Sequence, residues 1–188
     1  MNKPKLPAES VRDVDFSFQK MNRTDFEECE FVNCVFTDLS RLSFIDCHFK
    51  NCNLSNSKTV DTALKSCKFS GCKLLGMNFS ASKDFIFEVH FEDCLMDYVS
   101  FDRKKLNKSS FTRCKLHGAN FTEADLSKST LVNCDLYDAL FSGTNLSSVD
   151  LTSAINFIID PELNNIKKAK FTLQGLPGLL QRHHILLD

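Results

Sequence analysis

The 188-residue chain has no tryptophan, only two tyrosines, six glycines and four prolines. Its glycines form no G-x-G-x-x-G or G-x-x-x-x-G-K pattern, so no phosphate-binding loop is expected. No run of 18 or more apolar residues occurs, which argues against a membrane-spanning helix. The chain also lacks an excess of either charge, since it contains 23 Lys and Arg and 24 Asp and Glu. We therefore expect no direct nucleic-acid contact and no membrane insertion.

The N-terminal residues and the cysteines indicate where the protein is located and which kinds of site it lacks. Residues 1–13 are polar, include two prolines and lack an apolar core, so we expect no signal peptide and a cytoplasmic location. Nine cysteines cannot all pair within one chain, because nine is odd. No C-x₂-C spacing of a zinc site is present. These absences predict no metal and no disulfide framework.

What the sequence does contain is a period of five. From Phe16 a large apolar residue recurs at every fifth position as far as Leu151, with interruptions after Phe36 and after Phe79. Within this series only Thr59 is not a large hydrophobe. Five matches neither the 3.6-residue period of a helix nor the two-residue period of a strand. It predicts a chain that turns a corner every five residues, with two side chains inward and three outward.

The second inward slot lies two residues before each apolar residue and is usually Cys, Ser, Thr, Ala or Val. The exceptions are Gln19, Leu42, Met77, Asp84 and Lys104. All nine cysteines occupy this slot: Cys29, Cys34, Cys47, Cys52, Cys67, Cys72, Cys94, Cys114 and Cys134. We expect them to be buried free thiols that pack as small hydrophobes.

This A/C/S/T-x-L/F-x-x pattern resembles the pentapeptide-repeat family over roughly residues 14–155. The resemblance implies an all-β fold, a right-handed quadrilateral β-helix with four pentapeptides in each coil. Coils stacked at about 4.8 Å would give a rod on the order of 32 Å long. We expect a short N-terminal segment over residues 1–13, the β-helix over 14–155, and a C-terminal cap over 156–188.

The two interruptions decide which residues stack. We number the four sides from Phe44 as side one and treat Leu39–Arg41 and Ser82–Lys83 as corner bulges that skip no side. Side three then holds Cys29, Cys52, Cys72, Cys94, Cys114 and Cys134, side two holds Cys47 and Cys67, and side four holds Cys34. Within residues 82–90, Ile86 is the expected inward residue, with Phe85 and Phe87 as alternatives.

Charge is unevenly spread over the four sides. In this register side one is basic, with Lys20, Arg23, Lys65, Lys105, Lys108 and Lys128, and the other three sides are acidic. The outward carboxylates Asp97, Asp102, Asp135 and Asp138 are candidate partner-binding residues, because spaced negative charges complement a basic groove. The alternative is that this charge only keeps the rod soluble.

The tail from residue 156 loses the period of five. Leu173, Leu176, Leu179 and Leu180 have the spacing of one stripe on a short helix. The last coil of a solenoid needs a cap, so we expect this stripe to cover it, with Ile185 and Leu187 in a closing strand. The same six residues are the candidate interface of a homodimer.

Two segments narrow the resemblance within the family. The tail I-D-P-E-L-N-N-I…K-F…L-L…I from Ile159, and the repeats from Phe26 to Phe36, are similar to those of the microcin B17 immunity protein and of quinolone-resistance pentapeptide-repeat proteins. This implies a dimeric rod that imitates duplex DNA, binds DNA gyrase or a related type II topoisomerase, and protects it from a poison. The chain departs from that group in its net charge of −1 and its short interruptions.

A second hypothesis stays open. The rod is then a structural or adaptor module that binds another protein through one of its sides. An enzyme is not expected, because the repeat directs the cysteines inward and places no nucleophile beside the five histidines. We predict no catalytic residue and no cofactor.

Overall fold

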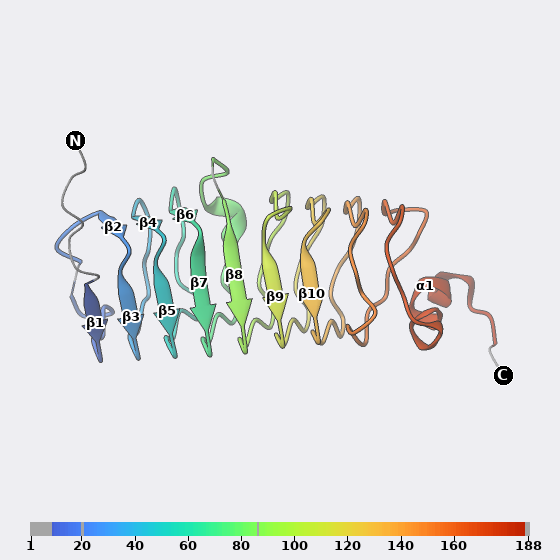
Figure 1. Cartoon of the computed structure of the whole chain (residues 1–188), viewed down its shortest axis with the longest axis horizontal. Coiled ribbons are helices and arrows are strands. Elements are labelled where there is room, and N and C mark those ends of the chain that lie inside the picture. Colours follow the sequence, from blue (N-terminus) through green and yellow to red (C-terminus); the bar gives the residue numbers. More distant parts are fainter. Residues whose placement is uncertain (1–8, 20, 86, 187–188) are drawn as a thin grey trace.

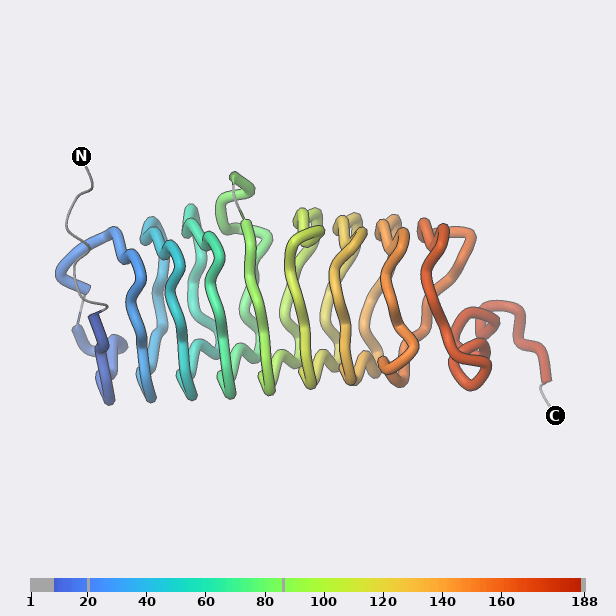
Figure 2. Tube along the Cα trace, in the orientation of Figure 1, coloured from blue at the N-terminus to red at the C-terminus, as the bar shows by residue number. Residues whose placement is uncertain are grey.

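The computed structural model describes residues 9–19, 21–85 and 87–186. The chain forms a straight solenoid whose coils lie side by side along one axis, with the two ends of the chain at opposite ends of the rod (Figures 1 and 2). The predicted right-handed quadrilateral β-helix is confirmed.

Short parallel strands form two of the four sides. Side two is a seven-stranded sheet in the order β1-β3-β5-β7-β8-β9-β10. Its strands are Ser10–Arg12, Glu30–Val32, His48–Lys50, Cys67–Ser70, Val89–Glu92, Ser110–Thr112 and Thr130–Val132. Side one contains β2 (Asp25–Glu27), β4 (Ser43–Ile45) and β6 (Ala63–Lys65). Sides three and four are held by single bridges, such as Lys115–Asp135 and Ser100–Asn120.

The core is a set of aromatic stacks that run along the axis. On side two the rings of Phe49 and Phe69 are parallel, with centroids 4.7 Å apart. On side four Phe79 and Phe101 stack in the same way at 4.9 Å. In-register pairing places large apolar side chains above one another in neighbouring coils. Rings on adjacent sides of one coil also meet edge to face, as Phe44 and Phe49 do with centroids 5.3 Å apart. This is why the sequence uses so much phenylalanine.

The chain turns at every corner of each coil although it has only six glycines, because other residues adopt the left-handed backbone conformation there. The residue two after the inward apolar residue usually has positive φ, and most of these residues are not glycine, for example Asn33, Asn51, Asp93 and Asn133. Asn and Asp tolerate this left-handed region better than other residues with a side chain. Gly118 is required for a second reason: a Cβ there would lie 2.7 Å from the Tyr98 ring of the preceding coil.

The first interruption is not a bulge, and this prediction was wrong. Leu39 is fully buried, its backbone NH bonds to the Lys58 carbonyl at 2.8 Å, and Asp38 bridges to Lys58. Residues around Leu39 therefore form side four of their own coil. Phe26 pairs with Phe44, 18 residues on. The coil is two residues short at one corner, rather than enlarged by three.

The corrected register also changes the cysteine columns. Phe31 pairs with Phe49, so every residue before the interruption moves by one side. The six-membered column on side three contains Cys34 and not Cys29: Cys34, Cys52, Cys72, Cys94, Cys114 and Cys134. The remaining three, Cys29, Cys47 and Cys67, share side two. All nine are buried free thiols, as predicted.

The second interruption is an enlarged coil. Phe69 pairs with Phe91, 22 residues on, so two residues are added on side one. Phe87 is buried and packs edge-on against Phe79, whereas Phe85 is 83% exposed. Ile86, the expected inward residue, lies outside the described residues. The green loop that stands out from the rod before β8 is this segment (Figure 2).

Coil pairing extends past both ends of the expected 14–155 range. β1 begins at Ser10, and bridges join Asn145 to Asn165 and Asp150 to Lys170. The cap then follows as η2 (Leu173–Gly175), α1 (Pro177–Leu180) and η3 (Gln181–His183). Ile185 is half exposed and lies in no strand, so the expected closing strand is wrong at this residue. Leu187 lies outside the described residues.

Candidate functional site

Of the predicted carboxylates, Asp97, Asp135 and Asp138 lie on side three, and Asp102 directly follows Phe101 on side four. Three of the four have a partner within the chain. Asp97 pairs with Lys115 at 3.3 Å, and its side chain is only 16% exposed. Asp102 lies 3.9 Å from the Arg103 guanidinium. Such contacts neutralise part of the charge that a partner would meet. The structure thus brings the carboxylates to neighbouring sides without leaving them all free.

Asp135 is the most constrained of the four. It accepts hydrogen bonds from His117 Nε2 at 2.7 Å, from Asn156 Nδ2 at 2.8 Å and from the Tyr137 backbone NH at 3.2 Å. Partial burial raises the pKa of Asp135, but these hydrogen bonds outweigh it and hold the pKa below its usual value. The carboxylate therefore serves first to join three successive coils.

Asp138 differs from the other three. It lies at a corner with φ of 55° and is exposed, and its side chain makes no ion pair or hydrogen bond to the described part of the chain. Tyr98, 73% exposed, occupies the same corner two coils earlier. Tyr137, 55% exposed, packs edge-on against His117. This side therefore combines free and paired carboxylates with two exposed tyrosines that the sequence reasoning did not single out.

The C-terminal cap exposes half of the predicted leucine stripe. Leu179 is buried and Leu180 half-buried, but Leu173 is 81% and Leu176 40% exposed. Gly178 explains the close approach of α1 to the last coil, since a Cβ there would lie 2.2 Å from the Phe157 carbonyl oxygen. With Ile185 and Leu186, the exposed leucines leave an apolar surface at this end of the rod.

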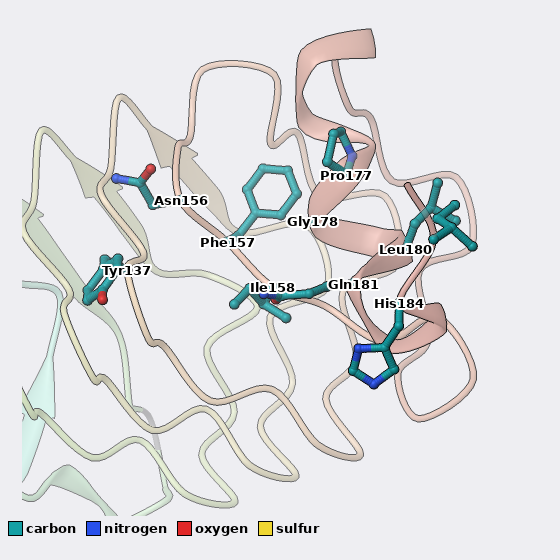
Figure 3. Close-up of a pocket in the computed structure, with 10 residues that line it drawn as sticks. Tyr137, Asn156, Phe157, Ile158, Pro177, Gly178, Leu180, Gln181 and His184 are labelled. Atoms are coloured by element: carbon teal, nitrogen blue, oxygen red, sulfur yellow. The ribbon is translucent and has the colours of Figure 1, made fainter. Parts of the chain in front are cut away.

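A groove of about 570 Å³ lies between the cap and side three. Figure 3 shows Tyr137, Asn156, Phe157 and Ile158 on the coil side, facing Pro177, Leu180 and His184 of the cap. A second hollow of about 390 Å³ lies on the other side of Asn156 and Phe157. Both are open surface features, and each is lined by a mixture of apolar and amide side chains.

Sequence reasoning missed a buried lysine on side one. Lys104 is 1% exposed, and its Nζ donates to the Ser82 carbonyl at 2.5 Å and to Asp84 Oδ1 at 2.6 Å. The ammonium also lies 5.1 Å from the centroid of the Phe87 ring. A signal was available, because Asp84 and Lys104 are both exceptions at the small inward slot and stand 20 residues apart, the length of one coil.

Neither a cluster of metal ligands nor a membrane-spanning helix is present in the part of the chain that the structure describes. Over residues 9–19, 21–85 and 87–186, no three His, Cys, Asp or Glu side chains gather as a metal site. In the same ranges, no helix has the length and apolar character needed to cross a membrane.

These features define a β-solenoid whose polar sides and capped end offer surfaces for binding. The sequence matches the pentapeptide repeat region family over residues 42–108 and 84–155, and the chain belongs to the pentapeptide-repeat family. No curated protein sequence matches it.

Among solved structures, the chain is similar to two trypsin-treated variants of QnrB1, described as a plasmid-mediated fluoroquinolone resistance protein. Identity is 20% to both, with TM-scores of 0.65 and 0.66. In each case 96% of this chain and 98% of the other chain are covered. The likeness thus supports the same fold over nearly the whole length.

Proposed function

We propose that this protein binds DNA gyrase or a related type II topoisomerase in the cytoplasm and protects it from a quinolone or a peptide toxin. In this proposal it acts by binding alone, with no chemistry and no contact with nucleic acid. The observation that supports it is the likeness to a fluoroquinolone resistance protein over 96% of the chain, rather than over the repeats alone.

The proposed contact is the carboxylate-bearing surface of sides three and four. A DNA-binding groove is basic, and carboxylates at regular coil spacing can occupy it as phosphates do. Asp138 is the strongest candidate, and Asp102 follows because its ion pair with Arg103 is long, at 3.9 Å, whereas Asp97 and Asp135 have closer partners in the chain. Tyr98 and Tyr137 add exposed aromatic area of the kind that anchors protein interfaces.

The second part of the proposal is a homodimer through the C-terminal segment. The exposed Leu173, Leu176, Ile185 and Leu186 supply apolar surface that a second copy can cover. Joining two rods at this end doubles the length of the carboxylate-bearing surface. A longer rod fits a longer stretch of a DNA-binding groove.

A supercoiling assay tests the proposal. Gyrase is titrated with the protein, with and without a quinolone, and the wild type is expected to restore supercoiling in the presence of the drug. Replacing Asp102 and Asp138 by Lys is expected to weaken protection at least tenfold. Asp25→Lys/Asp46→Lys is the matched control, since both aspartates are exposed on side one and the change in net charge is the same.

Failure of wild-type protection, with full activity of the drug-free enzyme at every concentration, would contradict the proposal. The adaptor hypothesis would then be favoured, because the pairing of Asp97 and Asp135 within the chain leaves a weaker negative field than DNA has. An adaptor needs only one complementary side.

A further inference from the structure

We propose a second interaction surface, on side one, that binds an acidic protein segment. It is formed by outward lysines from β6 to the last coil, and we call it the lysine side. Its members are Lys65, Lys83, Lys105, Lys108, Lys128, Lys167 and Lys168, all of them exposed.

The pairing of charges separates the lysine side from the rest of the rod. Within the described ranges, none of its seven ammonium groups has an ion pair or a side-chain hydrogen bond. Most cations elsewhere are paired with carboxylates: Arg12, Arg23, Lys50, Arg103, Arg113, Lys115, Lys170 and Arg182. The positive charge of this side is therefore left for a partner.

The carboxylates in the same stretch are already occupied. Asp84 pairs with Lys104, and Glu88 lies 3.6 Å from His90 Nε2. Asp125 accepts hydrogen bonds from Asn145 Nδ2 at 2.9 Å and from the Ser127 backbone NH at 3.0 Å. Solubility alone requires no such division between satisfied carboxylates and unpaired lysines.

The lysines are also aligned along the axis. Lys108, Lys128 and Lys168 follow Leu106, Leu126 and Ile166 by two residues, so they occupy the same corner of three coils, with Ser148 at that corner of the coil between Lys128 and Lys168. Their backbones are separated by multiples of about 4.8 Å. Lys108 and Lys128, one coil apart, lie within the screening length of about 8 Å at physiological salt, so the two lysines attract an anionic segment together.

Phe85 gives this side an apolar contact point. Phe85 is 83% exposed and belongs to the enlarged coil, which lies between the coil of Lys65 and the coil of Lys105. Lys104 holds the base of the loop through Ser82 and Asp84, so the ring is presented from a fixed support. In Figure 1 this loop stands beyond the outline of the other coils. An exposed phenylalanine ring offers a partner a large apolar contact area.

The width of the surface favours a protein segment over a nucleic-acid duplex. Each side is three residues of extended chain, about 10 Å across. A single helix is about 10–12 Å wide with its side chains, and an extended peptide is narrower. A duplex, whose major groove alone is about 12 Å wide, would overhang carboxylates of the adjoining sides, such as Asp61 and Asp150. We therefore assign an acidic helix or strand as the partner.

Fluorescence anisotropy with a labelled 20-residue peptide rich in Glu and Asp tests the proposal. The wild type is expected to bind it, more weakly as salt rises, and not to bind the Gln/Asn version of the same peptide. The triple variant Lys105→Glu/Lys108→Glu/Lys128→Glu should lose at least tenfold in affinity. Phe85→Ser should lose several-fold with a smaller change in salt dependence.

The matched control is Lys58→Glu/Lys68→Glu/Lys73→Glu. These lysines are equally exposed and unpaired within the described residues, but they lie on sides four, two and three, and the net charge of the two triple variants is the same. Equal losses in both variants, or no binding by the wild type, would overturn the proposal. Tighter binding of a single-stranded DNA 20-mer than of the peptide would also overturn it. Because the assay contains no topoisomerase, its failure is distinct from failure of the proposed function.

Discussion

At the residue scale, several side chains in the small inward slot donate hydrogen bonds to backbone carbonyls of the preceding coil. Ser57 Oγ donates to the Phe36 carbonyl at 2.8 Å, and Cys72 Sγ donates to the Phe49 carbonyl at 3.3 Å. Hydroxyl and thiol side chains in this slot can therefore both donate to a backbone carbonyl of the preceding coil. Burial raises the pKa of Cys47 to about 12, so this thiol stays protonated and unreactive near neutral pH.

Cys94 allows this slot to be tested. Its thiol donates to the Phe69 carbonyl at 3.4 Å, and a serine hydroxyl can make the same bond. Cys94→Ser is expected to reduce the free energy of unfolding by about 1 kcal/mol. Cys94→Leu overfills the column and should cost about 1–3 kcal/mol. Denaturant unfolding measures both, and a serine variant less stable than the leucine variant would contradict this account.

Asp135 predicts a dependence of stability on acid. Its pKa in the folded chain lies below the unfolded value of about 3.9. A depressed carboxylate pKa contributes stability that is complete above the unfolded pKa and is lost as the pH falls through the folded pKa. The free energy of unfolding of the wild type is thus expected to exceed that of Asp135→Asn by about 1 kcal/mol at pH 6. Thermal melts should show this difference shrinking towards pH 3, and a constant difference would argue against it.

At the element scale, the enlarged coil and Lys104 form one unit. Deleting Asp84 and Phe85 would leave Ser82-Lys83-Ile86-Phe87-Glu88, a regular pentapeptide that restores a 20-residue coil. With Lys104 retained, the deletion leaves a buried ammonium without its carboxylate and should cost about 1–3 kcal/mol. Combined with Lys104→Ala, the deletion should melt no lower than Lys104→Ala alone.

Circular dichroism melts of the three variants decide this point. If the deletion is equally harmful with lysine and with alanine at 104, the two features are independent. By contrast, removing Leu39–Arg41 should unfold the first coils, because Leu39 is buried in the core. The two interruptions are therefore opposite in kind, although each looks like a short slip in the sequence.

The period of five was sufficient to predict the fold, most of the inward residues and the buried thiols, but it missed the buried Leu39 and placed the exposed Asp84 in an inward slot. It was insufficient for register, because the eight-residue step from Phe36 to Phe44 fits either a bulge of three or a side shortened by two. The wrong choice moved Cys29 and Cys34 by one side. Contacts such as His117–Asp135 depend on register and on rotamers, so the pairing of the candidate carboxylates could not be read from the sequence.

At the scale of the whole molecule, the exposed end of the cap predicts self-association. Light scattering of the wild type should give twice the chain mass of 21.4 kDa. Leu173→Asp/Leu176→Asp should give a monomer with an unchanged melting temperature, since both side chains are exposed within one chain. Leu179 is unsuitable for this test because it is buried and its replacement would disrupt the cap.

Leu140→Asp provides the control for the dimer. Leu140 is 57% exposed, between the values for Leu176 and Leu173, but it lies on side four away from the cap. This variant should remain a dimer. A monomeric wild type would remove the dimeric part of the proposed function while leaving a single rod able to bind.

The unequal coils have a mechanical consequence. Each coil is hydrogen-bonded and packed only against the adjacent coils. A rod pulled by its two ends should therefore unfold one coil at a time, starting from an end. A 20-residue coil releases on the order of 70 Å of chain. The coil from Phe31 to Phe49 is two residues shorter, and the coil from Phe69 to Phe91 two residues longer. The short coil should give an extension step about 7 Å smaller, and the long coil a step about 7 Å larger. A force–extension record would therefore show the order in which the coils unfold.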